Sequence, residues 1–162
     1  MEVVRRAQGG DPDALRAIVD DLSAYLARIC ASIALDARDD ALQESLISIV
    51  TNLATLRDPA ALRAWARTIA VRESLRVVRA TRRDVPVAPE EFDGVGIPDG
   101  ATSVDVEQIL ASLPPHHRAV LVLRELEGLS EAEVAVALDV SVGTVKSRTS
   151  RAKEAFIRRW TA

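Results

Sequence analysis

Near the end of the chain, hydroxyl and basic side chains follow one another at helical spacing. These residues are Thr144, Lys146, Ser147, Arg148 and Arg151. Side chains of these types bond to base edges or to phosphate oxygens of nucleic acids. Their types and spacing therefore predict a contact with nucleic acid, provided that neighbouring elements hold them on an exposed helix.

Two short helices would position these side chains. Ser130 and Glu133 form a capping box that predicts a first helix over residues 130–138. After a tight connection, Ser141 is a plausible N-cap for a second helix over residues 142–152. Ala135 is small enough for the two helices to cross closely, and the pattern predicts a helix-turn-helix whose second helix enters the major groove of DNA. The alternative is a solvated helical hairpin whose charges only maintain solubility.

The composition of the chain and one segment rich in proline and glycine predict an all-α fold of two small domains. Hydrophobic residues make up 48% of the 162 residues and aromatic residues only 3%, which favours helices packed on helices. Residues 84–102 contain three prolines, three glycines, five acids and no base, and we interpret them as a flexible linker. The predicted domains are residues 1–83 and 103–162.

The sequence favours a non-catalytic intracellular protein. We find no catalytic set of residues, no phosphate-binding glycine loop and no cofactor motif. Cys30 is the single cysteine, and the adjacent His116 and His117 point to different faces of a helix, so we expect no disulfide framework and no metal site. We find no apolar run long enough to span a bilayer and no signal peptide, which predicts no membrane insertion and a cytoplasmic location.

Three segments in the last third resemble the C-terminal domain of bacterial sigma factors, above all the extracytoplasmic-function (ECF) subfamily. They are Leu-Pro-Pro-His-His-Arg-Ala-Val-Leu at 113–121, Glu-Gly-Leu-Ser-Glu-Ala-Glu-Val-Ala at 127–135 and Ser-Val-Gly-Thr-Val-Lys-Ser-Arg at 141–148. The resemblance implies that this domain binds the minus-35 promoter element and the flap tip of the polymerase β subunit. It also implies base and phosphate contacts for the five residues named first.

Residues 36–46 resemble the polymerase-binding segment of the same family, which grips the β′ clamp helices. The side chains implied in this contact are Asp39, Asp40, Gln43, Glu44, Leu46 and Ile47. Acids near a helix N-terminus are favoured there, and the exposed Gln43 and Glu44 could pair with arginines of a partner helix. The alternative is that these acids simply cap and solubilise a helix.

Residues 62–73 resemble the family's DNA-melting helix, which opens the minus-10 element. Asp58-Pro59 predicts the start of this helix, and we expect Leu62, Trp65 and Ile69 to face inward. Phosphate contacts with salt-sensitive affinity are expected from Arg63, Arg67, Arg72, Arg76 and Arg79. The sequence departs from the family pattern in two ways: Arg72 stands where many members have Asn, and residues 50–56 contain no aromatic side chain.

The resemblance implies an alternative sigma factor that binds core RNA polymerase and promoter DNA and is held in check by an anti-sigma factor. Two other classes remain open. One is a sigma-like decoy that binds an anti-sigma factor without supporting transcription. The other is a dimeric helix-turn-helix regulator that binds palindromic half-sites without polymerase.

Overall fold

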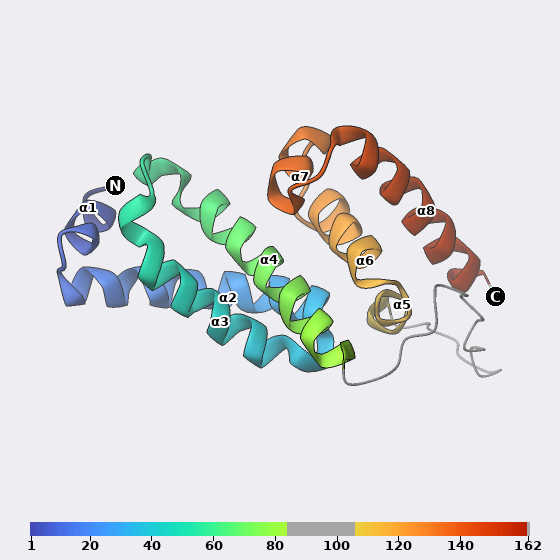
Figure 1. Cartoon of the computed structure of the whole chain (residues 1–162), viewed down its shortest axis with the longest axis horizontal. Coiled ribbons are helices and arrows are strands. Elements are labelled where there is room, and N and C mark those ends of the chain that lie inside the picture. The colour runs from blue at the N-terminus through green and yellow to red at the C-terminus, as the bar shows by residue number, and fades with distance from the viewer. Residues whose placement is uncertain (84–105, 162) are drawn as a thin grey trace. The chain divides into compact units, whose positions relative to one another are not determined.

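The computed structural model describes residues 1–83 and 106–161 (Figure 1). Every regular element in these two ranges is a helix, which confirms the predicted all-α class. The chain divides into two compact units, Met1–Val77 and Val78–Ala162. The predicted linker, residues 84–102, lies outside the described residues, and the predicted assignment of functions to domains stays a prediction.

The first unit is built from three helices and most of a fourth, joined by short 3-10 turns, and the fourth helix continues past Val77 into the second unit. The helices are α1 (Glu2–Gln8), α2 (Pro12–Ala34), α3 (Arg38–Asn52) and α4 (Leu62–Arg83). The turns are η1 (Leu35–Ala37), η2 (Leu53–Thr55) and η3 (Pro59–Ala61). Figure 1 shows α2 and α3 running side by side. Helix α1 is held in place because the Gln8 amide donates to the carbonyl oxygens of Leu53 and Leu56 at 3.0 and 2.8 Å.

A side-chain cap fixes the start of α2. The Asp11 carboxylate accepts hydrogen bonds from the backbone N–H groups of Asp13 and Ala14, and Pro12 occupies the first helical position. Arg6 donates to the same carboxylate from Nε at 2.9 Å and from Nη2 at 2.6 Å. These contacts tie the turn between α1 and α2 to the helix end.

Acid is expected to weaken this cap. The backbone N–H of Ala14 and the Arg6 guanidinium lower the pKa of Asp11. A carboxyl group with a lowered folded pKa stabilises the protein above its unfolded pKa of about 3.9. That stabilisation is lost as the pH falls through the lower folded pKa. The melting temperatures of wild type and Asp11→Asn should therefore differ most near neutral pH and converge in acid, and a difference independent of pH would contradict this role.

Small side chains allow α4 to pack closely in the first unit. Ala66, Ala70 and Val71 of α4 are fully buried. Leu62, Trp65 and Ile69, which the sequence analysis placed inward, are only half-buried. The interpretation followed the large apolar residues, whereas close helix packing places small residues at the centre of the contact.

The second unit holds α5 (Val106–Ser112), α6 (Pro115–Leu121), the π-helical turn η4 (Val122–Leu126), α7 (Glu131–Leu138) and α8 (Val142–Trp160). Leu110, Leu113, Leu121, Ala152 and Ala155 form a core cluster. None of the helices in the described parts of the chain combines the length and apolar character needed to cross a lipid bilayer.

Local signals in the sequence account for the helix-turn-helix of α7 and α8. Both hydrogen bonds of the Ser130–Glu133 capping box are present. Asp139 ends α7 in the left-handed conformation with φ of 54°, and Ser141 caps α8. Val134, Ala135 and Val145 are buried where the helices meet. The second helix continues past the predicted residue 152 as far as Trp160.

Candidate DNA and protein interfaces

The first turn of α8 is rigidly capped. The Ser141 hydroxyl accepts from the backbone N–H of Thr144 at 3.1 Å, and the two hydroxyl oxygens of Ser141 and Thr144 lie 2.9 Å apart. Thr144 is half-buried and its hydroxyl contacts the cap. The predicted base contact at Thr144 therefore competes with a contact inside the protein.

The outer face of α8 presents three of the predicted DNA-binding side chains to solvent. Lys146, Ser147 and Arg151 are exposed, while Val145 and Ala152 are buried on the opposite side. Lys146 Nζ lies 3.7 Å from a carboxylate oxygen of Glu131 on α7. A pair this long between exposed side chains adds little stability, so the ammonium group can exchange its partner at small cost.

Arg148 lies at the border of that outer face. Arg148 is half-buried. Burial of His116 on α6 lowers the pKa of that histidine, and the positive charge of Arg148 lowers it further. The structure thus places Arg148 near α6 and Arg151 outward, a difference that the sequence pattern did not show.

Two further residues of the first turn are open to a ligand, and the sequence analysis did not select them. Val142 is 41% exposed. A Cβ atom built on Gly143 would meet only the Ser141 hydroxyl, at 3.7 Å, within contact range. Their positions directly after the N-cap could have indicated this, because the N-terminal residues of a recognition helix face the groove.

The arginines of α4 divide into two faces. Arg72, Arg76 and Arg79 follow one another at spacings of four and three residues, and all three are exposed. Arg63 and Arg67 share a different face, because Arg63 and Arg72 are nine residues apart and a helix has about 3.6 residues per turn. The predicted row of phosphate contacts is therefore not one continuous surface.

Arg63 has a contact within the protein that the sequence did not reveal. Its guanidinium lies over the ring of Tyr25 on α2, 4.1 Å from the ring centroid, and Arg28 lies 5.9 Å from the same centroid. Tyr25 is buried. A cation over an aromatic face stabilises packing, so Arg63 joins α4 to α2.

The outer face of α3 combines acids with exposed apolar side chains. Asp39, Asp40, Gln43 and Glu44 are exposed, and Ile47 follows at 54% exposure. Leu46, which was predicted to contact the same partner, is half-buried.

Val50 extends this face and was missed by the sequence analysis. It is 40% exposed and lies three residues after Ile47, a spacing that places both side chains on one side of α3. The spacing itself was the available signal.

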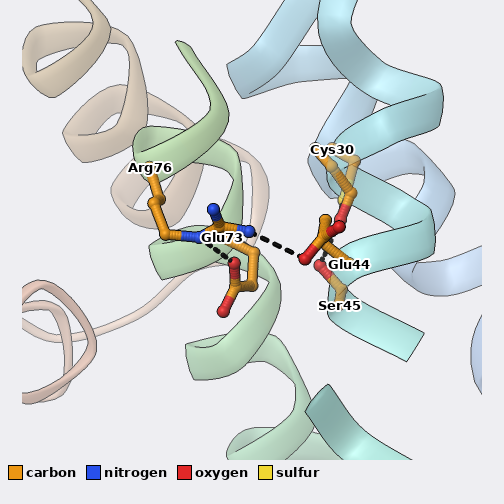
Figure 2. Close-up of polar contacts among 6 residues, drawn as sticks. Cys30, Glu44, Ser45, Glu73 and Arg76 are labelled. Carbon is orange, nitrogen blue, oxygen red and sulfur yellow. Dashed lines mark hydrogen bonds and ion pairs between the residues drawn. The ribbon is translucent and has the colours of Figure 1, made fainter. Parts of the chain in front are cut away.

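One ion-pair network joins the predicted polymerase-binding helix to the predicted DNA-melting helix. Figure 2 shows Arg76 of α4 between Glu73 of the same helix and Glu44 of α3. Arg76 Nε donates to Glu73 at 2.6 Å and Nη2 donates to Glu44 at 2.8 Å. Glu73 and then Glu44 raise the pKa of the Arg76 guanidinium. The structure thus brings together two residues that the sequence analysis assigned to different partners.

Small polar side chains are buried inside the first unit. Cys30 Sγ and Ser45 Oγ are 3.9 Å apart, and the Ser45 hydroxyl donates to the carbonyl of Ala41 (Figure 2). Burial raises the pKa of Cys30, although the hydroxyls of Ser74 and Ser45 oppose the shift. Cys30, Ser45 and Ser74 are fully buried, which indicates a packing role for the thiol.

The second unit has an apolar groove of about 260 Å³. Its walls come from α5, α6, η4 and α8, and its apolar lining includes Val106, Leu110, Leu121, Val122, Phe156 and Ile157. Val106 is 46% exposed and Ile157 is 59% exposed. Exposed apolar area of this kind is typical of surfaces that bind another protein.

An ion pair borders the groove. Lys153 Nζ lies 2.8 Å from a carboxylate oxygen of Glu125, and both residues line the groove. Lys153 of α8 therefore lies beside the apolar groove.

Within residues 1–83 and 106–161, no group of three or more His, Cys, Asp or Glu side chains is arranged to hold a metal ion. His116 and His117 are both half-buried near the start of α6.

The sequence matches two family models that together span most of the chain. Sigma-70 region 2 matches residues 15–84, and sigma-70 region 4 matches residues 103–156. The ECF RNA polymerase sigma factor SigM of Mycobacterium tuberculosis is 35% identical over 137 residues, which cover 82% of this chain and 68% of that protein. The ECF RNA polymerase sigma-E factor of Salmonella typhimurium is 32% identical over 172 aligned positions, covering 95% and 90%.

Solved structures share the fold. The sigma factor RpoE of Bartonella quintana, in complex with the anti-sigma factor NepR, superposes with a TM-score of 0.69 at 22% identity, covering 91% of this chain and 96% of that one. CnrH, in complex with the cytosolic domain of CnrY, superposes with a TM-score of 0.64 at 23% identity, covering 96% and 93%.

Proposed function

Because the chain belongs to the ECF family of RNA polymerase sigma factors, we propose that it binds core RNA polymerase and directs it to promoters through two DNA-binding helices. It is a transcription initiation factor, and we assign it no catalysis of its own. The observation that carries this proposal is the presence of both family regions in one chain, each with an exposed face of the expected chemistry.

The outer face of α3 is the proposed contact with the β′ clamp helices. Exposed carboxylates at Asp40 and Glu44 can pair with basic side chains, and Ile47 with Val50 offers apolar area beside them. A charged rim around a small apolar centre is the usual composition of a specific protein interface.

The two DNA elements are assigned to α8 and α4. On α8 we assign base contacts in the minus-35 element to Ser147, Lys146 and Arg151, while Thr144 and Arg148 lie at the edge of that contact. On α4 the exposed face of Arg72, Arg76 and Arg79 supports phosphate contacts near the minus-10 element. Arg63 and Arg67 face another way and would bind DNA there only if the strand followed a different path.

The apolar groove of the second unit is the proposed docking site for the β flap tip. A helix with apolar side chains at spacings of three and four residues fits such a groove. The Lys153–Glu125 pair offers a charge of either sign at its border. The exposed Leu126 and Ile157 supply apolar contact there.

We also propose an anti-sigma partner and a cytoplasmic location. One similar structure holds a sigma factor in complex with an anti-sigma factor, and the other holds CnrH in complex with the cytosolic domain of CnrY. An inhibitor would compete with polymerase if it covers the groove or the α3 face.

Gel filtration and footprinting separate this function from the two alternatives. The proposal predicts that the chain co-elutes with purified core polymerase and protects promoter DNA only in its presence. A dimer that protects a palindromic site without polymerase would indicate an ordinary regulator. Binding to an inhibitor without binding to core polymerase would indicate a decoy.

The two arginine faces of α4 predict different phenotypes. Arg72→Ala should reduce the slope of log affinity against log salt by about one for the polymerase complex on promoter DNA, because one phosphate contact is lost. Arg63→Ala should leave the slope unchanged and lower the free energy of unfolding by about 0.5–1 kcal/mol, because its contact with Tyr25 is lost. Equal slopes for wild type and Arg72→Ala would remove Arg72 from the interface.

A further inference from the structure

One arginine lies in the interior of the second unit. Arg118 of α6 is 1% exposed, which makes it the largest fully buried side chain in the described parts of the chain. Burying a guanidinium is costly unless hydrogen bonds replace the water that it loses. Its bonding partners therefore indicate what the residue holds in place.

Arg118 Nη1 contacts backbone carbonyls at the end of α5 and just after it. Arg118 Nη1 lies 3.1 Å from the oxygen of Leu110, 3.3 Å from that of Ala111 and 3.2 Å from that of Leu113. The last carbonyls of a helix have no partner within the helix, and they carry the negative end of its dipole. A buried cation at this point both satisfies these oxygens and complements the dipole.

The short helix α5 depends on tertiary contacts to stay folded. The helix has seven residues, and helices this short are unstable unless tertiary contacts hold them. Leu110 is packed into the core cluster, whereas Val106 at the other end is 46% exposed. Arg118 holds the end of α5 opposite to this exposed residue.

The same short helix forms one wall of the apolar groove. Val106 and Leu110 line the groove from α5, and Val122 and Leu126 line it from η4. The turn that contains η4 is held in a similar way, because Arg124 Nη1 donates to the carbonyl of Leu129. Two inward-pointing arginines thus fix backbone segments that shape the groove.

We propose that Arg118 is a positioning residue for polymerase docking: it holds α5 as a preformed wall of the groove without touching the partner. This inference rests on the proposed function, which assigns the groove to the β flap tip. A preformed groove binds more tightly than one that must order a helix on binding, because no free energy is spent on ordering the helix when the partner docks.

If Arg118 only positions α5, its loss should destabilise α5 and not the rest of the second unit. The exposed DNA-facing residues lie in the first half of α8, and the groove uses Phe156 and Ile157 near its end. The capping box of α7 and the cap of α8 do not involve Arg118. Loss of Arg118 should therefore loosen α5 and leave the helix-turn-helix in place.

The test compares Arg118→Met, Val106→Asp and the double variant in the full chain. Val106→Asp places a charge on the exposed wall of the groove, so it blocks docking without removing the support of α5. Affinity for purified core polymerase is measured by fluorescence anisotropy, and hydrogen exchange reports the opening of α5, α7 and α8 separately. Arg118→Lys is the conservative variant, since its ammonium can reach some of the same carbonyls.

Each single variant is expected to bind core polymerase about tenfold more weakly. The double variant should lose little more than the weaker single variant, because both changes remove the same contact. Arg118→Met should speed exchange in α5 by about tenfold or more while α7 and α8 keep their protection. Arg118→Lys should fall between Arg118→Met and wild type in both measurements.

The possible failures are distinguishable. Unchanged affinity of Val106→Asp would overturn the groove as the docking site, and the role of Arg118 with it. Weakened binding by Val106→Asp but wild-type binding by Arg118→Met would overturn the role of Arg118 alone. Additive losses, or equal loss of protection in α5, α7 and α8, would show that Arg118 stabilises the whole unit.

Discussion

Core RNA polymerase is expected to bind the Ile47→Asp variant about 30- to 100-fold more weakly than wild type. Ile47 is 54% exposed at the centre of the acidic outer face of α3, next in line after Gln43 and Glu44. An apolar side chain in this position is a candidate hot spot, and such residues contribute about 2 kcal/mol or more when lost. A carboxylate there would also be buried against the partner without a designed counter-ion, which adds a desolvation cost. Titration of labelled core polymerase by anisotropy gives the affinity directly.

The matched control for this variant is Ala24→Asp. Ala24 is an exposed position in the middle of α2, so the substitution adds the same charge to the same unit away from the α3 face. It should bind core polymerase like wild type at equal salt. Circular dichroism of both variants checks that the unit stays folded. Wild-type affinity in Ile47→Asp would remove the α3 face from the polymerase interface.

Arg151→Ala is expected to cost about 1–3 kcal/mol in minus-35 binding, which is roughly 5- to 150-fold. Arg151 projects from the outer face of α8, about two and a half turns after the capped start, and the face beside it includes Ser147 and Lys146. If it forms paired hydrogen bonds with a base, the variant should also lose discrimination at one base pair. A panel of promoter duplexes, each with one substituted pair in the upstream element, measures both effects in the polymerase complex.

Arg158→Ala supplies the comparison on the same helix. Arg158 is exposed and lies seven residues after Arg151, so it has the same charge and nearly the same direction but sits about 10 Å further along the axis. Its removal should weaken binding only slightly, equally for every duplex in the panel, and more at low salt. If Arg151→Ala weakened binding equally for every duplex, Arg151 would contact only the phosphate backbone of the DNA. Arg148→Ala should have a smaller effect than Arg151→Ala because Arg148 is half-buried.

Local signals made the helix-turn-helix predictable from the sequence. The Ser130–Glu133 capping box, the cap at Ser141 and the small Ala135 act over a few residues, and the structure contains all three. The Asp11 cap with Pro12 at the start of α2 is a local feature of the same kind. Caps of this kind can be predicted from the sequence because the hydrogen bonds that they form connect residues two or three positions apart.

The direction of side chains on α4 was not predictable in the same way. Seven arginines surround this helix, and the sequence alone does not say which side packs on α2 and α3. Ala66 and Ala70 are fully buried, and alanines carry little hydrophobic signal. The position of Arg63 over Tyr25 depends on that packing, since the two residues are 38 positions apart.

The groove of the second unit depends on contacts that are still more distant in the sequence. Val106 and Ile157 line the same groove although they are far apart in the sequence. In the sequence, Arg118 is only one position of the motif at 113–121. Its burial among the carbonyls of α5 becomes evident once the helices are assembled. Family resemblance named the partner, whereas the choice of the groove as its docking surface is a proposal argued from the structure.

The central claim is that this chain gives core RNA polymerase the ability to start transcription at particular sites. Runoff transcription with purified core polymerase and genomic fragments tests it most directly. The account predicts discrete transcripts that appear only when the chain is added and that weaken with Ile47→Asp and Arg151→Ala. Transcripts identical with and without the chain, from a polymerase that a known sigma factor activates on its own promoter, would contradict it.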